Sequence, residues 1–547
     1  MQGGSHGIAH PPASDFGSGD RRAGVFQPGP LPGRLDPDFG ACRALGIKAL
    51  ILPYEATANG AVQSIPDAEL YASFFNQHRD EIDGLVICLP NFGDEIAIAE
   101  LVSRAKLGVP ILMQASKDEV DKVSVSQRRD AFCGKILVTN NFYQYGVPFT
   151  ETTSHTSDTF SAEFGEDLER FSRVCRTVKG LRGARLGAIG ARTGAFQTMR
   201  YSEKLLQASG VTVVTVDRSK MIGAAGRVSD TDADLITKLE KIKACGRIPA
   251  HIKPEPIARQ AKWSLAVDRW IEENGCGASA IQCWRSLQDN FGCATCLTIS
   301  MMGEELMPSA CEVDIMGALS MYALALAGGA PPAILDWNYN YGNEVGKCVC
   351  THCGNFPKKF SGDTPEISEL DVPGTVIGRE KCFGAGKGKV TVKVKAGDMT
   401  VFRVSSDARR GTLKTYLGQG AFTDDPFPMD GGIAVSQVKD LRKLMRFVTQ
   451  NGFEHHGAMV RGHHADVVAE AVTRYLDWPM YTPRRRSRGD AVTNDPIPNI
   501  KAKALWMRRR AVQMVYEAQL GHPGGDFSAI DILAMLFIGV LNHDAAQ

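Results

Sequence analysis

CEVDIMGALSMYALALAGGAPPAILD, residues 311–336, carries acidic residues at both ends and no charge between them. The uncharged part, Ile315 to Leu335, is long enough to raise the question of a membrane span, but Gly328-Gly329 and Pro331-Pro332 interrupt it. The helical part, about Ile315 to Ala327, is shorter than the roughly 20 apolar residues that cross a bilayer. We therefore expect a buried helix.

Beyond the prolines, Ala333-Ile334-Leu335 predicts a short strand, so Asp336 stands at a strand end and Glu312 at a helix start. Ligands of open α/β sheets bind at such places. The two acids alone are equally compatible with ordinary element ends, where Glu312 only complements the helix dipole. A third segment, Phe453-Glu454-His455-His456-Gly457, adds imidazoles. Two carboxylates and one imidazole can hold a divalent metal of the Mn, Mg or Fe kind.

These segments resemble the metal-binding triad of the L-fucose isomerase and L-arabinose isomerase superfamily. The likeness covers about residues 44–482 and is carried by CLTIS (296–300), ACEVDIMGALS (310–320), PAILDW (332–337) and HHGAMVRGH (455–463). It implies that Glu312, Asp336 and His456 hold a divalent metal, with Mn²⁺ first and Mg²⁺ or Co²⁺ as alternatives. It also implies an aldose–ketose isomerase, in which Glu312 and Asp336 act as the acid/base pair and the reaction passes through a cis-enediolate.

The segment Lys347 to Cys353, KCVCTHC, offers a further ligand. In a strand, Cys348, Cys350 and His352 share one face. A structural zinc site is an alternative, although no second cysteine pair is visible to complete it. Arabinose isomerases carry an additional histidine ligand at about this place and fucose-type members lack it. His352 is therefore either a fourth metal ligand or a contact to sugar hydroxyls.

Other polar residues are candidates for the substrate pocket. Asn91 lies in the loop PNFGDE after an expected strand, where the composition equally allows a plain turn. His455 is expected to support the site by packing, with metal contact as the alternative. The substrate-binding candidates are Gln282, Trp337, Asn338 and Asn91, and the expected surface or capping histidines are His463 and His464.

Helices and strands alternate from Leu45 onward, which predicts an α/β fold with two Rossmann-like, doubly wound parallel-sheet domains. Period-two alternation at 390–394 and 399–404 predicts antiparallel strands and a β-rich, barrel-like C-terminal domain. The predicted organisation is an irregular arm (1–43), a first α/β domain (44–165), a second with Glu312 (166–328), the β-rich domain with Asp336 and His456 (329–482), and a linker with a further fragment (483–547).

Individual elements follow from apolar runs and helix signals. Family members normally open with a buried strand that begins the first sheet, and residues 1–43 show no candidate for it. The predicted strands are 47–52, 84–89, 109–113, 135–138, 184–190, 211–216 and 280–284. The predicted helices are 67–78, 95–104, 164–179, one ending at 207, 229–242 with a serine cap, 254–274 with proline in its first turn, and 465–476.

Bulk composition limits the partners and the compartment. The chain has 62 basic and 61 acidic residues, a balance that indicates neither nucleic acid nor a membrane surface as partner and fits a small-molecule sugar. Fourteen scattered cysteines, with no signal-peptide core near the start, indicate a cytoplasmic protein with reduced thiols. Gly187, Gly190 and Gly194 lack the G-x-G-x-x-G spacing, so no nucleotide is expected. The resemblance implies a homo-oligomer, a trimer or hexamer.

The last segment is of a different kind. After the basic stretch from Pro483, the sequence LGHPGGDFSAIDIL (520–533) resembles the start of a transketolase's thiamine-diphosphate domain. It is too short to bind thiamine diphosphate, so we expect a fusion, frameshift or read-through product and a functional link to a transketolase.

Two rivals to the isomerase remain open. One is a non-catalytic sugar-binding or regulatory protein on the same scaffold, and the other is a defective isomerase–transketolase fusion product. The identity of the sugar does not follow from the sequence.

Overall fold

The computed structural model describes Arg21–Phe26, Cys42 and residues 45–481, apart from 195, 251, 284–285, 353, 363, 365–366, 371–381, 386–391 and 429–431. Residues Met1–Pro483 form one compact unit. The predicted linker from Pro483 and the transketolase-like tail lie outside the described residues.

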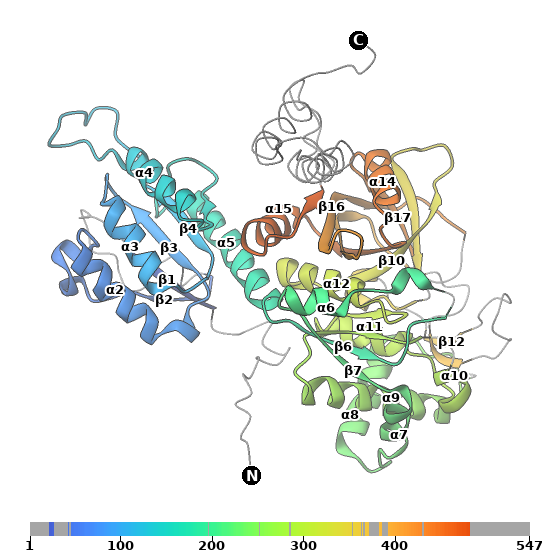
Figure 1. The fold of residues 1–547 in the computed structure, drawn as a ribbon. Helices are drawn as coiled ribbons and strands as arrows, with labels where there is room; N and C mark the ends of the chain where they lie inside the picture. The colour runs from blue at the N-terminus through green and yellow to red at the C-terminus, as the bar shows by residue number, and fades with distance from the viewer. Residues whose placement is uncertain are drawn as a thin grey trace, which may run out of the picture. The chain divides into compact units, whose positions relative to one another are not determined.

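The first sheet is parallel, with strand order β2-β1-β3-β4-β5 (Figure 1). Along β3, Leu85, Ile87 and Leu89 pack against α2, α3 and α4, whereas Val86 and Cys88 pack against α5. This alternation is expected of a strand buried on both faces. The elements are β1 (Arg21–Phe26), β2 (Ile47–Leu50), α2 (Ile65–Gln77), β3 (Leu85–Leu89), α3 (Glu95–Ala105), β4 (Ile111–Ala115), α4 (Ala131–Gln144), β5 (Thr150–Glu151) and α5 (Ala162–Leu181), with short 3₁₀ turns η2 (Tyr54–Ala56), η3 (Ala58–Gly60) and η4 (Arg79–Glu81).

Two predictions fail in this region. The arm predicted to be irregular contains β1, which pairs with β2 on one side and β3 on the other. It is the missing first strand, and its sequence, RRAGVF, hides it because two arginines and a glycine break the apolar run. The strand predicted at 135–138 is instead part of helix α4. Its short apolar run fits either structure, and the buried positions Ala131, Lys135, Val138 and Phe142 recur with the helical period.

The second sheet is also parallel, with order β7-β6-β8-β9. Helices α5 and α12 pack on one face of it, through Leu186 and Ala280 among others, and α7 and α9 pack on the other face. The elements are β6 (Arg185–Ile189), η5 (Gln197–Met199), α6 (Glu203–Ala208), β7 (Thr212–Val216), α7 (Arg218–Gly226), α8 (Ala233–Cys245), α9 (Pro254–Glu273), β8 (Ala278–Ile281), α10 (Ser286–Phe291), α11 (Cys296–Glu304), β9 (Ser309–Cys311) and α12 (Ile315–Gly328).

The helices here differ from prediction in their starts. The predicted helix from Ser229 begins at Ala233, because Asp232 and not the serine accepts the capping hydrogen bond. The helix ending near Gln207 is only the short α6, preceded by η5, and α7 was not predicted. Helix α9 begins with Pro254 as predicted.

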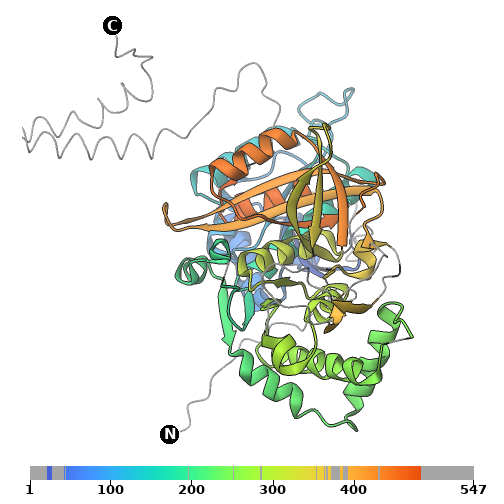
Figure 2. The same cartoon turned by 90° about the vertical axis from the view of Figure 1, so that its right-hand side faces the viewer.

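The described part of the third sheet has eight strands and contains both antiparallel and parallel pairings. Strands β17, β11, β10, β18, β15 and β16 pair in an antiparallel ring that the β16–β17 pairing closes (Figure 2). Short β14 and β19 add parallel edges, which corrects the antiparallel expectation for 390–394. Strands β12 (Ser368–Leu370) and β13 (Cys382–Ala385) form a separate two-stranded antiparallel sheet. The other elements of this region are β10 (Pro332–Asn340), β11 (Lys347–His352), α13 (Lys358–Ser361), β14 (Val392–Lys393), β15 (Gly397–Asp407), β16 (Thr412–Thr423), β17 (Gly432–Val438), α14 (Leu441–Gln450), β18 (His456–Arg461), α15 (Ala465–Glu470), the π-helix η6 (Ala471–Tyr475) and β19 (Met480–Tyr481).

Helix α12 lies between two sheets. Its side chains share one core with Leu186 and Ala280 of the second parallel sheet and with Ile334, Phe402 and Ala458 of the mixed sheet. A helix that is apolar all round is buried, and Ile315 to Ala327 is buried without exception. Among the described residues, no helix is both long and apolar enough to cross a membrane. The α/β class with parallel sheets and a β-rich mixed sheet is confirmed; the predicted domain boundaries stay predictions.

Candidate metal centre

Glu312 stands in a strained turn at the carboxyl end of β9. Glu312 and Val313 both adopt left-handed backbone conformations, with φ of 65° and 57°. Such conformations are costly for non-glycine residues and most of all for a β-branched one. Asp314 closes the turn, because its Oδ1 accepts a hydrogen bond of 2.8 Å from the Gly317 amide at the start of α12. The strain therefore lies directly at the acidic residue predicted to bind metal.

Asp336 and His456 are paired across two strands. They are register partners in the antiparallel ladder of β10 and β18, so their side chains lie on one face of the sheet. Ile334, two residues before Asp336, and its register partner Ala458, two residues after His456, pack in the core that contains α12. The same face thus meets the start of α12, where Glu312 lies. Asp336 was predicted at a strand end, but β10 continues to Asn340.

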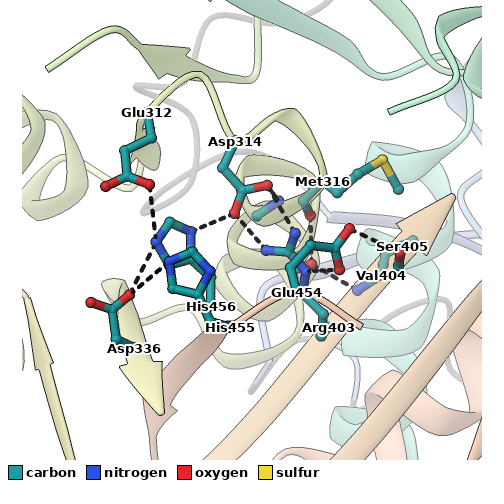
Figure 3. Close-up of polar contacts among 12 residues, drawn as sticks. Glu312, Asp314, Met316, Asp336, Arg403, Val404, Ser405, Glu454, His455 and His456 are labelled. Atoms are coloured by element: carbon teal, nitrogen blue, oxygen red, sulfur yellow. Dashed lines mark hydrogen bonds and ion pairs between the residues drawn. The ribbon is translucent and has the colours of Figure 1, made fainter. Parts of the chain in front are cut away.

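The three predicted ligands converge (Figure 3). His456 Nε2 lies 3.1 Å from Asp336 Oδ1 and 3.6 Å from Glu312 Oε2. Two sets of side chains bring one possible ligand atom each within 4.8 Å of one another: Glu312 with His455 and His456, and Asp336 with His352 and His456. The rings of His352 and His456 lie 5.4 Å apart between centroids. The geometry therefore places His352 and His455 beside the triad.

The other ring nitrogen of His456 contacts a buried charge cluster. Nδ1 lies 2.8 Å from Asp314 Oδ2, and Asp314 in turn accepts two hydrogen bonds from Arg403, of 2.6 and 2.9 Å. Arg403 Nε also contacts Glu454 Oε2 at 3.2 Å, and Ser405 donates to Glu454 Oε1 at 2.9 Å. Arg403 and His456 have no exposed surface.

The charges of this cluster shift one another's pKa values. Burial alone would raise the pKa of Asp314, but Arg403 and His456 hold it well below its ordinary range. Burial would lower the pKa of His456, but its hydrogen bond to Asp314 and the adjacent Asp336 carboxylate raise it to about 9. Burial likewise opposes ionisation of Asp336, and the nearby histidines, His352 first, keep its pKa low. Asp314 and Asp336 are therefore both anionic at neutral pH.

The residues fit a divalent metal. Asp336 Oδ1 and His456 Nε2 are buried, and within the described part of the chain neither forms a hydrogen bond of good geometry. Buried polar atoms in this state are uncommon and call for an explanation such as an ion. Two carboxylates and an imidazole suit Mn²⁺, Mg²⁺ or Fe²⁺ better than a soft-ligand metal.

The candidate pocket residues make other contacts. Trp337 Nε1 donates to Tyr416 Oη at 3.0 Å, and Asn338 Oδ1 accepts from the amide and hydroxyl of Thr351. Gln282 Oε1 accepts from the Ala191 amide at 3.0 Å. Asn91 Oδ1 accepts from Gly93 in its own loop. These bonds account for local structure, and the role of the four residues in substrate binding stays a prediction.

The remaining candidates separate from the centre. Cys348 and Cys350 share the predicted face, with their sulfurs 3.8 Å apart, but neither belongs to a possible metal-binding group among the described residues. His464 precedes α15 and contacts Arg173, and His463 is exposed near Asp398. His463 is thus at the surface, whereas His464 is half-buried at the start of α15 and its side chain makes no capping hydrogen bond.

Sequence reasoning missed the supporting cluster of Asp314, Arg403 and Glu454. A signal for Arg403 was present: it follows Met399 and Val401 at period two on the strand face that packs in the interior of the mixed sheet. A charge at such a position requires a buried partner. The partner could not be named, because Asp314 is 89 residues away in the chain.

Comparison with known proteins gives two domain matches. Residues 39–182 match the family described as fucose/sulfoquinovose isomerase, N-terminal domain, and residues 350–482 match the L-fucose isomerase, C-terminal domain. The chain is 29% identical to a sulfoquinovose isomerase of Alkalicoccus urumqiensis over 56% of this chain and 66% of the relative. It is 27% identical to one of Priestia megaterium, over 54% and 64%. The matched segments thus span just under two thirds of these relatives.

Proposed function

The chain belongs to the fucose isomerase superfamily, and from this we propose that it is a metal-dependent aldose–ketose isomerase. The observation that carries the proposal is that Glu312 and Asp336, which come from two different sheets, both approach the buried Nε2 of His456, at 3.6 and 3.1 Å. A protein that only binds sugar has no need of such a ligand set.

The residues take the following roles in the proposal. Glu312, Asp336 and His456 hold a divalent cation, with Mn²⁺ as first choice, and His352 is a fourth ligand or a contact to sugar hydroxyls. The cation, when bound, supplies Lewis-acid stabilisation of negative charge on the sugar oxygens. Glu312 and Asp336 transfer the proton between C1 and C2 as base and acid, through a cis-enediolate. Glu312 is buried beside the imidazole, whereas the side chain of Asp336 is 27% exposed and can be reached from solvent.

For the substrate we propose a sugar with an anionic group, sulfoquinovose being the first to test because the relatives carry its name. Arg218 supports an anion. It is 6% exposed, and its Nε and Nη2 form no hydrogen bond to any described residue. A buried guanidinium without a carboxylate partner is unfavourable unless an anion meets it. Its Nη1 donates to the carbonyl of Gln282 directly after β8, the strand beside the one that leads to Glu312.

Homo-oligomerisation, a cytoplasmic location and a link to a transketolase stay predictions of this proposal. None of them is needed for the chemistry assigned to the centre.

Glu312→Gln tests the proposed activity. We expect turnover to fall by orders of magnitude, because the amide can neither carry the proton nor ligate metal as an anion. The measurement is ketose formation from sulfoquinovose, L-fucose and L-arabinose with added Mn²⁺. Glu166→Gln, at an exposed position of α5, should retain the parent rate. Unchanged sugar affinity with no turnover in the parent chain would instead favour the non-catalytic binder.

A further inference from the structure

The two ring nitrogens of His456 have different neighbours. Nε2 faces Glu312 and Asp336, whereas Nδ1 lies 2.8 Å from Asp314 Oδ2 (Figure 3). A carboxylate accepts and does not donate, so this contact requires the hydrogen on Nδ1. The lone pair of the neutral ring is then on Nε2, which is the atom that faces the proposed metal ligands.

Asp314 is itself held in one orientation. Its Oδ2 accepts from Arg403 Nη1 at 2.6 Å and its Oδ1 from Nη2 at 2.9 Å, which is the bidentate geometry that most restricts a carboxylate. The far side of the guanidinium is fixed by Glu454, through Nε at 3.2 Å. Asp314 is almost fully buried, and helix α12 is anchored through its Oδ1.

We propose that Asp314, clamped by Arg403, is the positioning residue that fixes the tautomer and orientation of His456 for metal binding. The inference rests on the proposed metal centre. Partners of this kind on metal-ligating histidines are a general device, and their loss typically weakens metal binding about 10- to 100-fold.

The two oxygens of Asp314 separate this role from helix capping. Oδ1 accepts from the Gly317 amide, and Oδ2 alone contacts the imidazole. Asparagine caps helices about as well as aspartate, so Asp314→Asn keeps the cap on Oδ1. It places an NH₂ opposite Nδ1 and also removes the hydrogen bond from Arg403 Nη1 to Oδ2. That group donates, which favours the tautomer with the hydrogen on Nε2 and blocks metal binding there. The same exchange in a catalytic Asp–His pair elsewhere keeps geometry but gives the wrong tautomer.

The experiment compares Mn²⁺ affinity of metal-free Asp314→Asn, Glu454→Gln and parent protein by calorimetric titration. Glu454→Gln is the matched control, because it removes a carboxylate from the same buried cluster without touching the imidazole. We expect Asp314→Asn to weaken binding about 10- to 100-fold and Glu454→Gln to change it far less. The visible spectrum of the Co²⁺ form should change only in Asp314→Asn, and excess Mn²⁺ should restore part of its turnover.

The outcomes are distinct. Parent-like Mn²⁺ affinity in Asp314→Asn overturns the inference, and so does an equal loss in both variants with equally lowered melting temperatures, since that is a purely structural effect. No Mn²⁺ binding by the parent protein overturns the proposed metal centre itself. If Asp314→Asn does not fold, Arg403→Lys is tested in its place. Lysine keeps the positive charge but cannot form the bidentate contact to Asp314. An unchanged Mn²⁺ affinity of Arg403→Lys would then overturn the inference.

Discussion

Glu312 and Val313 adopt a strained backbone conformation at the position of one candidate metal ligand. Two consecutive left-handed residues, one of them β-branched, occur where a glycine would be relaxed. The turn is held by neighbours on both sides: Val313 packs in the core around α12, and Asp314 is tied to the helix start and to Arg403. Backbone strain that persists at a cluster of possible metal ligands is typical of a functional site.

Arg218→Met is a prediction about substrate selection. We expect it to raise KM for sulfoquinovose about 10- to 100-fold, because a hydrogen bond to a charged group contributes roughly 1.5–3 kcal/mol. Methionine fills similar apolar space beside Trp263, over which the guanidinium lies. The measurement is the steady-state kinetics of the anionic sugar and of a neutral aldose. An equal effect on both sugars would mean that Arg218 acts on the fold and not on the anion.

Helix α12 connects local pattern to the site. Its uncharged sequence follows from burial between two sheets, while its first turn supports the metal centre through Asp314. Gly317 in that turn is required by space: a Cβ there would lie 2.7 Å from Asp314 Cγ and 2.9 Å from Arg403 Nη1.

Gly317→Ala is therefore expected to destabilise the protein and to weaken Mn²⁺ binding, although alanine in a helix interior is intrinsically favoured by about 1 kcal/mol. The control is Gly165→Ala in α5, where a Cβ meets no atom within 4 Å, and where we expect stabilisation of about 0.5–1 kcal/mol. Urea denaturation of the two variants measures both effects. If Gly317→Ala were stabilising, Asp314 and Arg403 would have moved to accommodate the added methyl group at little cost.

Local patterns predicted some elements and not others. The alternating strands of the mixed sheet and the long amphipathic helices α5 and α9 carry enough residues for their period to be decisive. The four residues 135–138 are too few to show a period, and β1 is short and begins with two arginines. Both errors arose where pairing or packing with distant segments, and not the local period, selects the structure.

The parts of Met1–Pro483 meet at the candidate site. Glu312 follows a strand of the second parallel sheet, whereas Asp336 and His456 belong to the mixed sheet. An ion held by all three would link these sheets and favour the folded state over the unfolded one.

We accordingly expect Mn²⁺ to raise the melting temperature. A ligand at 100 times its dissociation constant stabilises the native state by about 2.7 kcal/mol. Glu312→Gln should lose most of this increase and chelation should abolish it in the parent protein, as followed by scanning calorimetry. An equal increase in parent and variant would place the bound ion elsewhere.

The sequence by itself determined the α/β class, the buried central helix and the identity of the candidate ligands, because periodicity, proline and glycine positions and quoted motifs are local properties. Only the tertiary structure decided that Glu312, Asp336 and His456 meet, that Arg403 neutralises buried carboxylates, and that β1 completes the first sheet. The physical reason is that these facts depend on strand pairing and side-chain contact between residues far apart in the chain, which no local period encodes.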